Sequence, residues 1–163
     1  MTVPTCASSG RNRPIPFYAG PRLPRAQVAR IGTAHCGDGS NEVRLLKING
    51  RPGPNKFGYG SDWDGGFCVE LQPGTYQVAI AYSNLNVLSR RNLRSKEDLQ
   101  LTFTAQPGRD YVIDPAVVNE TWQPRVVDAA TGAVAASHDK VEKLCKTFIR
   151  ALPSDEPDPT TCN

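Results

Sequence analysis

The sequence predicts an all-β protein, an antiparallel β-sandwich of about seven short strands followed by one C-terminal α-helix. Apolar residues recur at every second position in several short runs, which is the pattern of half-buried strands. The 163 residues include 14 glycines and 14 prolines, a composition typical of short elements joined by many turns. The connections lack the helical pattern that parallel strands require, so antiparallel pairing in two packed sheets is the economical arrangement.

The clearest strand pattern lies in residues 67–82. Apolar and polar residues alternate over 67–71, the turn Gln72-Pro73-Gly74 follows, and alternation resumes over 76–82. This order predicts a hairpin on which the rest of the domain packs.

The remaining strands are shorter and are separated by turn signals. Asn49-Gly50 is a strong hairpin dipeptide, and a Gln-Pro-Gly-Arg turn at 106–109 is expected to reverse the chain. The predicted strands cover residues 27–31, 42–48, 99–104, 111–113, 120–128 and 133–136.

Composition divides the chain into three parts. Residues 1–16 contain three prolines and no apolar period, which predicts a flexible linker, and residues 17–136 hold the sandwich. In residues 137–163, Asp139 and Glu142 resemble a capping box, and Pro153 ends the helical pattern. The apolar positions of that helix fall on one face: Val141, Leu144, Cys145, Phe148 and Leu152.

The formal net charge of +3 is too weak a bias to favour nucleic acid as a partner. The one basic run, Arg90, Arg91, Arg94 and Lys96, is interpreted as a solvated loop between strands. We therefore expect no nucleic-acid partner.

Five cysteines are widely spaced, without the short Cys-x-x-Cys spacing of zinc and redox sites. Such spacing in a turn-rich chain favours disulfides and an oxidising compartment, although free thiols in a reducing compartment are the alternative. Of the three possible pairings of four cysteines, Cys36–Cys68 and Cys145–Cys162 are favoured. The first would join neighbouring strands, and the second would tie the C-terminal tail to the helix.

Cys6 is the odd cysteine. No apolar run approaches the roughly 20 residues of a membrane span, and no signal peptide is visible in this chain. If a leader has been removed, Cys6 stands where a bacterial lipoprotein carries its lipid. We therefore expect a lipid anchor at Cys6.

An ordered set of short motifs resembles a group of small bacterial envelope lipoproteins of unknown activity. The set comprises Tyr18 to Pro24, Val28 to Ile31, Ile48-Asn49-Gly50, Leu71 to Tyr76, Ala105 to Tyr111, Trp122, and Asp128 to Gly132. The resemblance covers residues 17–136, and its Pro-Gly-x-Tyr turn also occurs in PEGA-like and transthyretin-like modules. It implies a secreted, membrane-tethered β-sandwich of the bacterial cell envelope, in the periplasm or at the outer membrane, with no catalytic residues to transfer.

Phe57, Tyr59 and Trp63 lie in a Gly-rich loop, where exposed aromatics could stack on a sugar or anchor a protein partner. The alternative is that they cap an open end of the core. Asp62 and Asp64 resemble half a calcium loop, but Gly66 and Pro73 occupy positions that need oxygen ligands, so no metal or other cofactor is expected.

The two histidines, His35 and His138, have no nucleophile motif beside them, and we expect no catalytic residue. The sequence thus predicts a non-enzymatic interaction or structural module of the cell envelope, with an unknown protein or glycan partner. A carbohydrate- or peptidoglycan-binding module is the alternative, and a hydrolase is a third reading.

Overall fold

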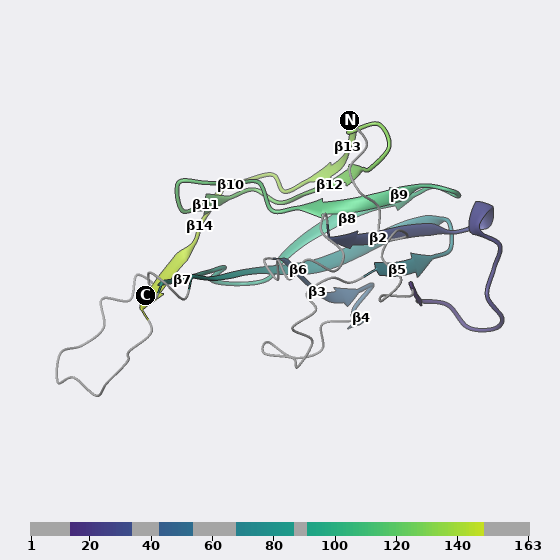
Figure 1. Cartoon of the computed structure of the whole chain (residues 1–163), viewed down its shortest axis with the longest axis horizontal. Coiled ribbons are helices and arrows are strands. Elements are labelled where there is room, and N and C mark those ends of the chain that lie inside the picture. Colours follow the sequence, from purple (N-terminus) through teal and green to yellow (C-terminus); the bar gives the residue numbers. More distant parts are fainter. Residues whose placement is uncertain (1–13, 34–42, 54–67, 87–90, 149–163) are drawn as a thin grey trace.

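The computed structural model describes residues 14–33, 43–53, 68–86 and 91–148, and within them the chain is almost entirely β (Figure 1). A single 3₁₀ turn, Arg25–Gln27, is the one helical element in these ranges. The predicted all-β class is therefore confirmed. In the same ranges, no helix has the length and apolar character that crossing a membrane requires.

Within the part of the chain that the structure describes, the strands form two larger sheets and one small sheet. The first sheet has the order β1 (Ile15–Pro16), β5 (Cys68–Leu71), β2 (Ala29–Thr33), β9 (Asp110–Asp114), β12 (Arg125–Asp128) and β13 (Val134–Ser137). The second has the order β15 (Cys145–Phe148), β7 (Arg91–Arg94), β6 (Gly74–Asn86), β3 (Val43–Ile48) and β4 (Arg51–Pro52), and β8 (Leu99–Ala105) also pairs with β6. The small sheet contains β10 (Val117–Val118), β11 (Thr121–Trp122) and β14 (Glu142–Lys143).

The two larger sheets share one hydrophobic core. Ile31, Val69 and Ile113 of the first sheet belong to the same buried cluster as Leu45 and Ile80 of the second. The period-two pattern predicted these positions, and strand β8 follows it throughout, with every second residue buried.

The sequence predicted antiparallel pairing throughout, but two of the strand pairs are parallel. β1 runs parallel to β5, and β2 runs parallel to β9, with Ile31 opposite Tyr111. A parallel pair needs a long crossover between its strands. Here the chain makes that crossover by passing through the second sheet, which takes the place of the missing helix.

The predicted hairpin of residues 67–82 is wrong. β5 lies in the first sheet and β6 in the second, so the Gln72-Pro73 turn carries the chain from one sheet to the other. Both strands still turn their alternate apolar residues towards the common core, which explains why the pattern identified the strands but not their pairing. The Tyr76 hydroxyl donates to the Gln72 carbonyl at 2.7 Å and holds this turn.

The turn at residues 106–109 behaves in the same way. It connects β8 of the second sheet to β9 of the first, so the expected reversal is again a crossing between sheets. A tyrosine again holds the turn: the Tyr111 hydroxyl donates to the Thr104 carbonyl and accepts the Gln106 N–H.

The Asn49-Gly50 hairpin is confirmed. Ile48 pairs with Arg51, and both turn residues have positive φ, 48° for Asn49 and 75° for Gly50. These values match the two-residue turn that follows the twist of the flanking strands.

The predicted C-terminal helix is also wrong, because residues 142–148 form the strands β14 and β15. Cys145 pairs with Arg94 of β7, and the Leu144 N–H donates to the Glu120 carbonyl at 2.8 Å. Leu144 and Cys145 are both buried, whereas Val141 is 59% exposed, so the apolar residues do not share a helical face. A short isolated helix is marginal in water, and backbone pairing with existing strand edges prevails here.

Gly53 is buried against an irregularity in β3, where the register with β6 shifts between Leu45 and Lys47. Its N–H donates to the Leu46 carbonyl at 2.7 Å. A Cβ atom at position 53 would overlap the Leu45 carbonyl oxygen and lie 3.2 Å from the Leu46 carbonyl carbon. Because both neighbours are backbone atoms, no side chain can move aside to make room.

We expect Gly53→Ala to lower the free energy of unfolding by about 1–3 kcal/mol, the usual cost of overpacking a buried position. Urea denaturation measures this difference. Lys47→Ala, at an exposed position of β3, should change stability by less than about 0.5 kcal/mol. Equal stability of Gly53→Ala and the wild type would contradict the close backbone approach.

Candidate functional site

A cleft of about 460 Å³ opens where one side of the second sheet meets one side of the first. Its walls come from β8, from the turn at 106–109 and from the segment around β13, which is the last strand of the first sheet. The side chains that line it are mainly small or polar: Thr102, Phe103, Thr104, Gln106, Arg109, Tyr111, Asp128, Thr131, Ala133, Val134 and Ala135. The volume lies in the range of small-molecule and peptide sites.

The wall formed by β8 is an open sheet edge. Among the described residues, β8 pairs with β6 alone. Thr102 stands opposite Gln77 of β6, and Gln77 uses both its N–H and its C=O on Asn49 at the far side of β6, each at 2.8 Å. The backbone groups of Thr102 therefore point away from β6, towards the cleft.

Thr104 points the same way, as the alternation of a strand requires. Its side chain lies 3.3 Å from that of the facing Thr75, the close approach expected of an antiparallel pair that exchanges no backbone hydrogen bonds. Its carbonyl oxygen accepts a 3.4 Å bond from the Tyr111 hydroxyl, which in turn accepts the Gln106 N–H at 3.1 Å. Tyr111 thus satisfies the C-terminal end of the open edge and leaves the part around Thr102 available.

Arg109 supplies positive charge at the same end of the cleft. One of its terminal nitrogens lies 3.4 Å from Asp128, and the side chain is 44% exposed. The other carboxylate oxygen of Asp128 accepts the N–H groups of Ala130 and Thr131, which fixes Asp128 in its turn. Because this ion pair is long and solvated, it contributes little stability, and the guanidinium retains donors for a second carboxylate.

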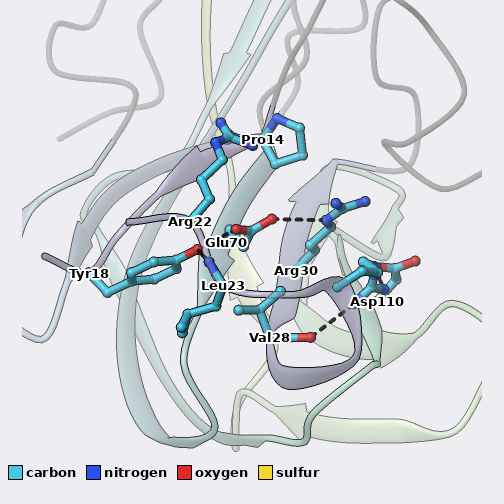
Figure 2. Close-up of polar contacts among 9 residues, drawn as sticks. Pro14, Tyr18, Arg22, Leu23, Val28, Arg30, Glu70 and Asp110 are labelled. Carbon is cyan, nitrogen blue, oxygen red and sulfur yellow. Dashed lines mark hydrogen bonds and ion pairs between the residues drawn. The ribbon is translucent and has the colours of Figure 1, made fainter. Parts of the chain in front are cut away.

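A second polar cluster lies on the opposite face of the first sheet from the core, and Figure 2 shows its residues. Glu70 is only 2% exposed. Its carboxylate accepts a hydrogen bond of 2.5 Å from the Tyr18 hydroxyl and forms an ion pair with Arg30, whose Nε lies 3.4 Å from the other carboxylate oxygen. The hydrogen bond to Glu70 is the main cause that raises the pKa of Tyr18 above 10.0.

This cluster fastens the N-terminal segment to the first sheet. The Tyr18 hydroxyl also accepts the Leu23 N–H at 3.2 Å, and Arg22 donates to the Pro14 carbonyl (Figure 2). The Phe17 N–H donates to the Glu70 carbonyl. The sheet therefore begins at β1, inside the stretch predicted as a linker of residues 1–16. The cluster has a structural role, because its polar groups pair with one another and hold the N-terminal segment on the sheet.

The predicted site residues lie in different places. Cys6, Cys36, Phe57, Tyr59, Trp63 and Cys162 fall outside the described residues, so the lipid site and the aromatic site remain predictions. Cys145 is disulfide-bonded, and its pairing with Cys162 remains a prediction. Cys68 is a free, buried thiol, which corrects the predicted Cys36–Cys68 disulfide. Cys68 shares the outer face of the first sheet with Glu70, two residues on, rather than meeting another sulfur.

Burial raises the pKa of the Cys68 thiol from 9.0 to about 12, with nearby charges as smaller causes. At pH 8 the thiolate fraction is about a thousandfold lower than at the usual pKa, since the shift is about three pH units. We expect Cys68 to resist iodoacetamide in the native protein at pH 8 and to react after unfolding in urea, as measured by peptide mass.

The pH dependence has a defined sign. A thiol whose folded pKa is raised contributes stability that is present below pH 9 and is lost as the pH rises towards 12.

The control for the iodoacetamide experiment is Cys68→Ala, in which the peptide containing position 68 can no longer be labelled. Rapid native labelling of Cys68 at pH 8 would contradict its burial.

Two local findings concern possible metal ligands and one of the histidines. Among the described residues, no group of three His, Cys, Asp or Glu side chains could hold a metal ion. The His138 ring contacts its own loop, with Nδ1 2.9 Å from the Lys140 carbonyl oxygen.

Sequence reasoning missed the cleft and with it Thr102, Arg109 and Tyr111. A signal was present, because each Gln-Pro-Gly turn is followed within three residues by a tyrosine, Tyr76 or Tyr111. The hydroxyl of each tyrosine bonds to the backbone on the other side of its turn. This repeated arrangement marks two of the crossings between the sheets.

Comparisons of the chain with protein-family models, with curated proteins and with solved structures gave no match.

Proposed function

We propose that this protein is a non-enzymatic interaction module of the β-sandwich type. Its binding surface is the open edge of β8 together with the adjoining cleft. One observation carries the proposal: the backbone groups of Thr102 face the cleft, and no strand among the described residues pairs with them. An unpaired sheet edge is a ready template for another chain, and native proteins usually block such edges when they have no partner.

No residue of β8 itself blocks the edge, and β13 bounds the cleft on its other side. The seven residues of β8 include no proline, no lysine and no other charged side chain, and the pairing of β8 with β6 runs without a bulge. The side chains exposed along it are Gln100, Thr102 and Thr104, which are compatible with a neighbouring strand.

A ligand screen with matched variants tests this function. A random-peptide display library and an array of bacterial cell-wall glycans serve as probes. Ala135→Trp places an indole in the cleft, whereas Val118→Trp alters a 64% exposed position on β10 that does not line it. We expect ligands that lose at least tenfold in affinity with Ala135→Trp and are unaffected by Val118→Trp.

Other outcomes would change the proposal. Ligands that ignore both tryptophan variants, or none from either probe set, would remove the cleft as a binding surface. Chemical conversion of a bound ligand would contradict a non-enzymatic role. Glycan binding that is lost in Trp63→Ala alone would move recognition to the predicted aromatic loop.

The proposed location is the bacterial cell envelope, with a lipid anchor at Cys6, and this proposal rests on the resemblance of residues 17–136 to envelope lipoproteins. The intact mass of the protein from membrane and soluble fractions of its native host tests it. A lipid adduct on Cys6 in the membrane fraction is the expected result. A soluble protein with an unmodified Cys6 would contradict it.

A further inference from the structure

The polar groups of the cleft point to one class of ligand: we propose that it binds a small hydroxylated monocarboxylate, a molecule of the size and chemistry of a sugar acid. Arg109 binds the carboxylate, and the open backbone of Thr102 binds a hydroxyl group. The inference rests on the proposed function, because it names the ligand class of the same surface.

The space beside β8 suits a compact ligand. Cα atoms of β8 and β13 lie within 8 Å of each other, whereas a strand inserted along the whole of β8 would need a separation of about 10 Å, twice the usual spacing of paired strands. The cleft of about 460 Å³ between these strands is of the size that encloses a small molecule. A ligand there uses part of the edge of β8 and the turn beyond it.

Arg109 is the anion-binding group of the cleft. Its guanidinium is 44% exposed and lies 3.4 Å from Asp128, and it donates no hydrogen bond within the described part of the chain. Arg25 and Arg125 also form ion pairs with carboxylates of the first sheet, but each donates a hydrogen bond to its partner. Arg109 therefore retains the donors with which a planar guanidinium binds a carboxylate through two parallel hydrogen bonds.

The charge of the lining favours a ligand with one negative charge. Among the described residues that line the cleft, Arg109 and Asp128 are the charged ones, and their charges cancel. Asp128 cannot swing aside, because its other oxygen accepts the N–H groups of Ala130 and Thr131. A phosphate dianion would thus place two negative charges beside Asp128 with one guanidinium to balance them, and repulsion disfavours it relative to a carboxylate.

The remaining polar groups suit hydroxyls. The N–H and C=O of Thr102 point into the cleft, and neither forms a hydrogen bond within the described ranges. The exposed Gln106 amide adds a donor and an acceptor, and the Thr131 hydroxyl, which accepts the Ala133 N–H at 3.2 Å, still has its proton to donate. Because a hydroxyl group donates and accepts, it can bond both backbone groups of Thr102.

The aromatic residues of the lining argue against an apolar ligand. Phe103 and Tyr111 are both buried in the core, and the Tyr111 hydroxyl already bonds to the backbone of its turn. The opposite wall is formed by the small apolar residues Ala133, Val134 and Ala135, which suit the C–H face of a sugar ring. The cleft therefore offers polar partners on one side and a small apolar surface on the other.

A titration of the ¹⁵N-labelled full chain, followed by NMR, measures both the affinity and the place of binding. The probes are glucuronate, galacturonate and N-acetylmuramate, with glucose and glucose phosphorylated on its terminal hydroxyl as comparisons. We expect a dissociation constant below about 1 mM for at least one sugar acid, with shifts of the Thr102 and Arg109 N–H signals. Glucose and its phosphate should bind at least tenfold more weakly. Preference for N-acetylmuramate would indicate a cell-wall source, and preference for a uronate would indicate another polysaccharide.

Two pairs of variants assign the roles. Arg109→Gln should weaken binding of the sugar acid at least tenfold, whereas Arg125→Gln, at a similarly exposed arginine that does not line the cleft, should leave it unchanged. Thr102→Pro removes the N–H that points into the cleft without removing a bond to β6, and Thr102→Val keeps it. We expect a loss of at least threefold for Thr102→Pro alone. Circular dichroism of each variant establishes that it is folded.

Three results would overturn the inference: no binding of any of the sugar acids, tighter binding of the phosphorylated glucose, or unchanged affinity in Arg109→Gln. Neutral glycans or peptides that bind and are lost in Ala135→Trp, while the sugar acids do not bind, would refute this ligand class alone and leave the proposed function intact. If no ligand of any class responds to Ala135→Trp, the proposed function fails as well.

Discussion

Replacing Trp122 with alanine should lower the free energy of unfolding by about 3–5 kcal/mol. Trp122 is 1% exposed and lies on the two-residue strand β11 of the small sheet. Its ring centroid is 5.8 Å from that of Tyr82, which lies on β6 of the second sheet. The loss combines the transfer of a large apolar side chain with the cavity that remains.

The size of this effect follows from the weakness of the small sheet. Its three strands have two residues each, so their few hydrogen bonds cannot hold it in place. Trp122 attaches it to the core, together with the buried Leu144 just after β14. Loss of Trp122 should therefore loosen the small sheet from the rest of the domain before the two larger sheets separate.

Urea denaturation followed by circular dichroism measures the loss. Trp122→Phe keeps an aromatic ring at the site and should cost less than alanine. Val118→Ala, at an exposed position of the same small sheet, should stay within about 0.5 kcal/mol of wild type. A loss below about 1 kcal/mol for Trp122→Ala would show that the ring does not anchor the sheet.

Glu70→Ala should cost about 2–4 kcal/mol, because removal of one partner of a buried ion pair leaves the other without compensation. The Arg30 side chain is 17% exposed and Glu70 is its only ion-pair partner among the described residues. The Tyr18 hydroxyl would lose its short bond as well. We place the expected cost below that of a fully buried pair because water still reaches Arg30.

Two further variants separate the charge from the hydrogen bond. Glu70→Gln keeps an acceptor for Tyr18 but removes the charge, so its cost should be smaller than that of alanine. Tyr18→Phe removes the hydroxyl alone, and faster hydrogen exchange of the Phe17 and Leu23 N–H groups should report the loosened segment. If all three variants unfold at the same urea concentration as wild type, the cluster does not fasten the N-terminal segment.

Local pattern predicted much of the fold. The alternation in residues 99–104 was sufficient for β8, because a half-buried strand needs an apolar residue at every second position. Asn49-Gly50 was sufficient for the β3–β4 turn, because few residue types tolerate two successive positive φ values. In both cases the determining interaction acts between residues close in sequence.

Which strand pairs with which could not be predicted from the same pattern. Val69 and Val78 face one common core from opposite sheets, and a hairpin would bury the same residues. The alternating pattern is identical in the two arrangements, so it could not distinguish a hairpin from a crossing between sheets.

The prediction of a C-terminal helix failed for a related reason. Leu144 and Cys145 fit a helical stripe, but the free edges of β7 and β11 offered backbone partners that only the assembled fold provides. The cleft likewise depends on two edges, β8 and β13, that approach each other only after both sheets have formed. No local signal could report either of them.

The repeated crossings between the two larger sheets also govern when the protein can fold. Ile31 of β2 must wait for Tyr111, eighty positions later, before the first sheet can close. Contacts this distant in sequence slow folding, because the intervening chain must be ordered at the same time. A chain that emerges gradually from a ribosome could therefore not complete the first sheet until most of the chain had been made. For a protein proposed to reach the cell envelope, this late closure would keep the polypeptide extended during the interval in which export requires it to be threaded across a membrane.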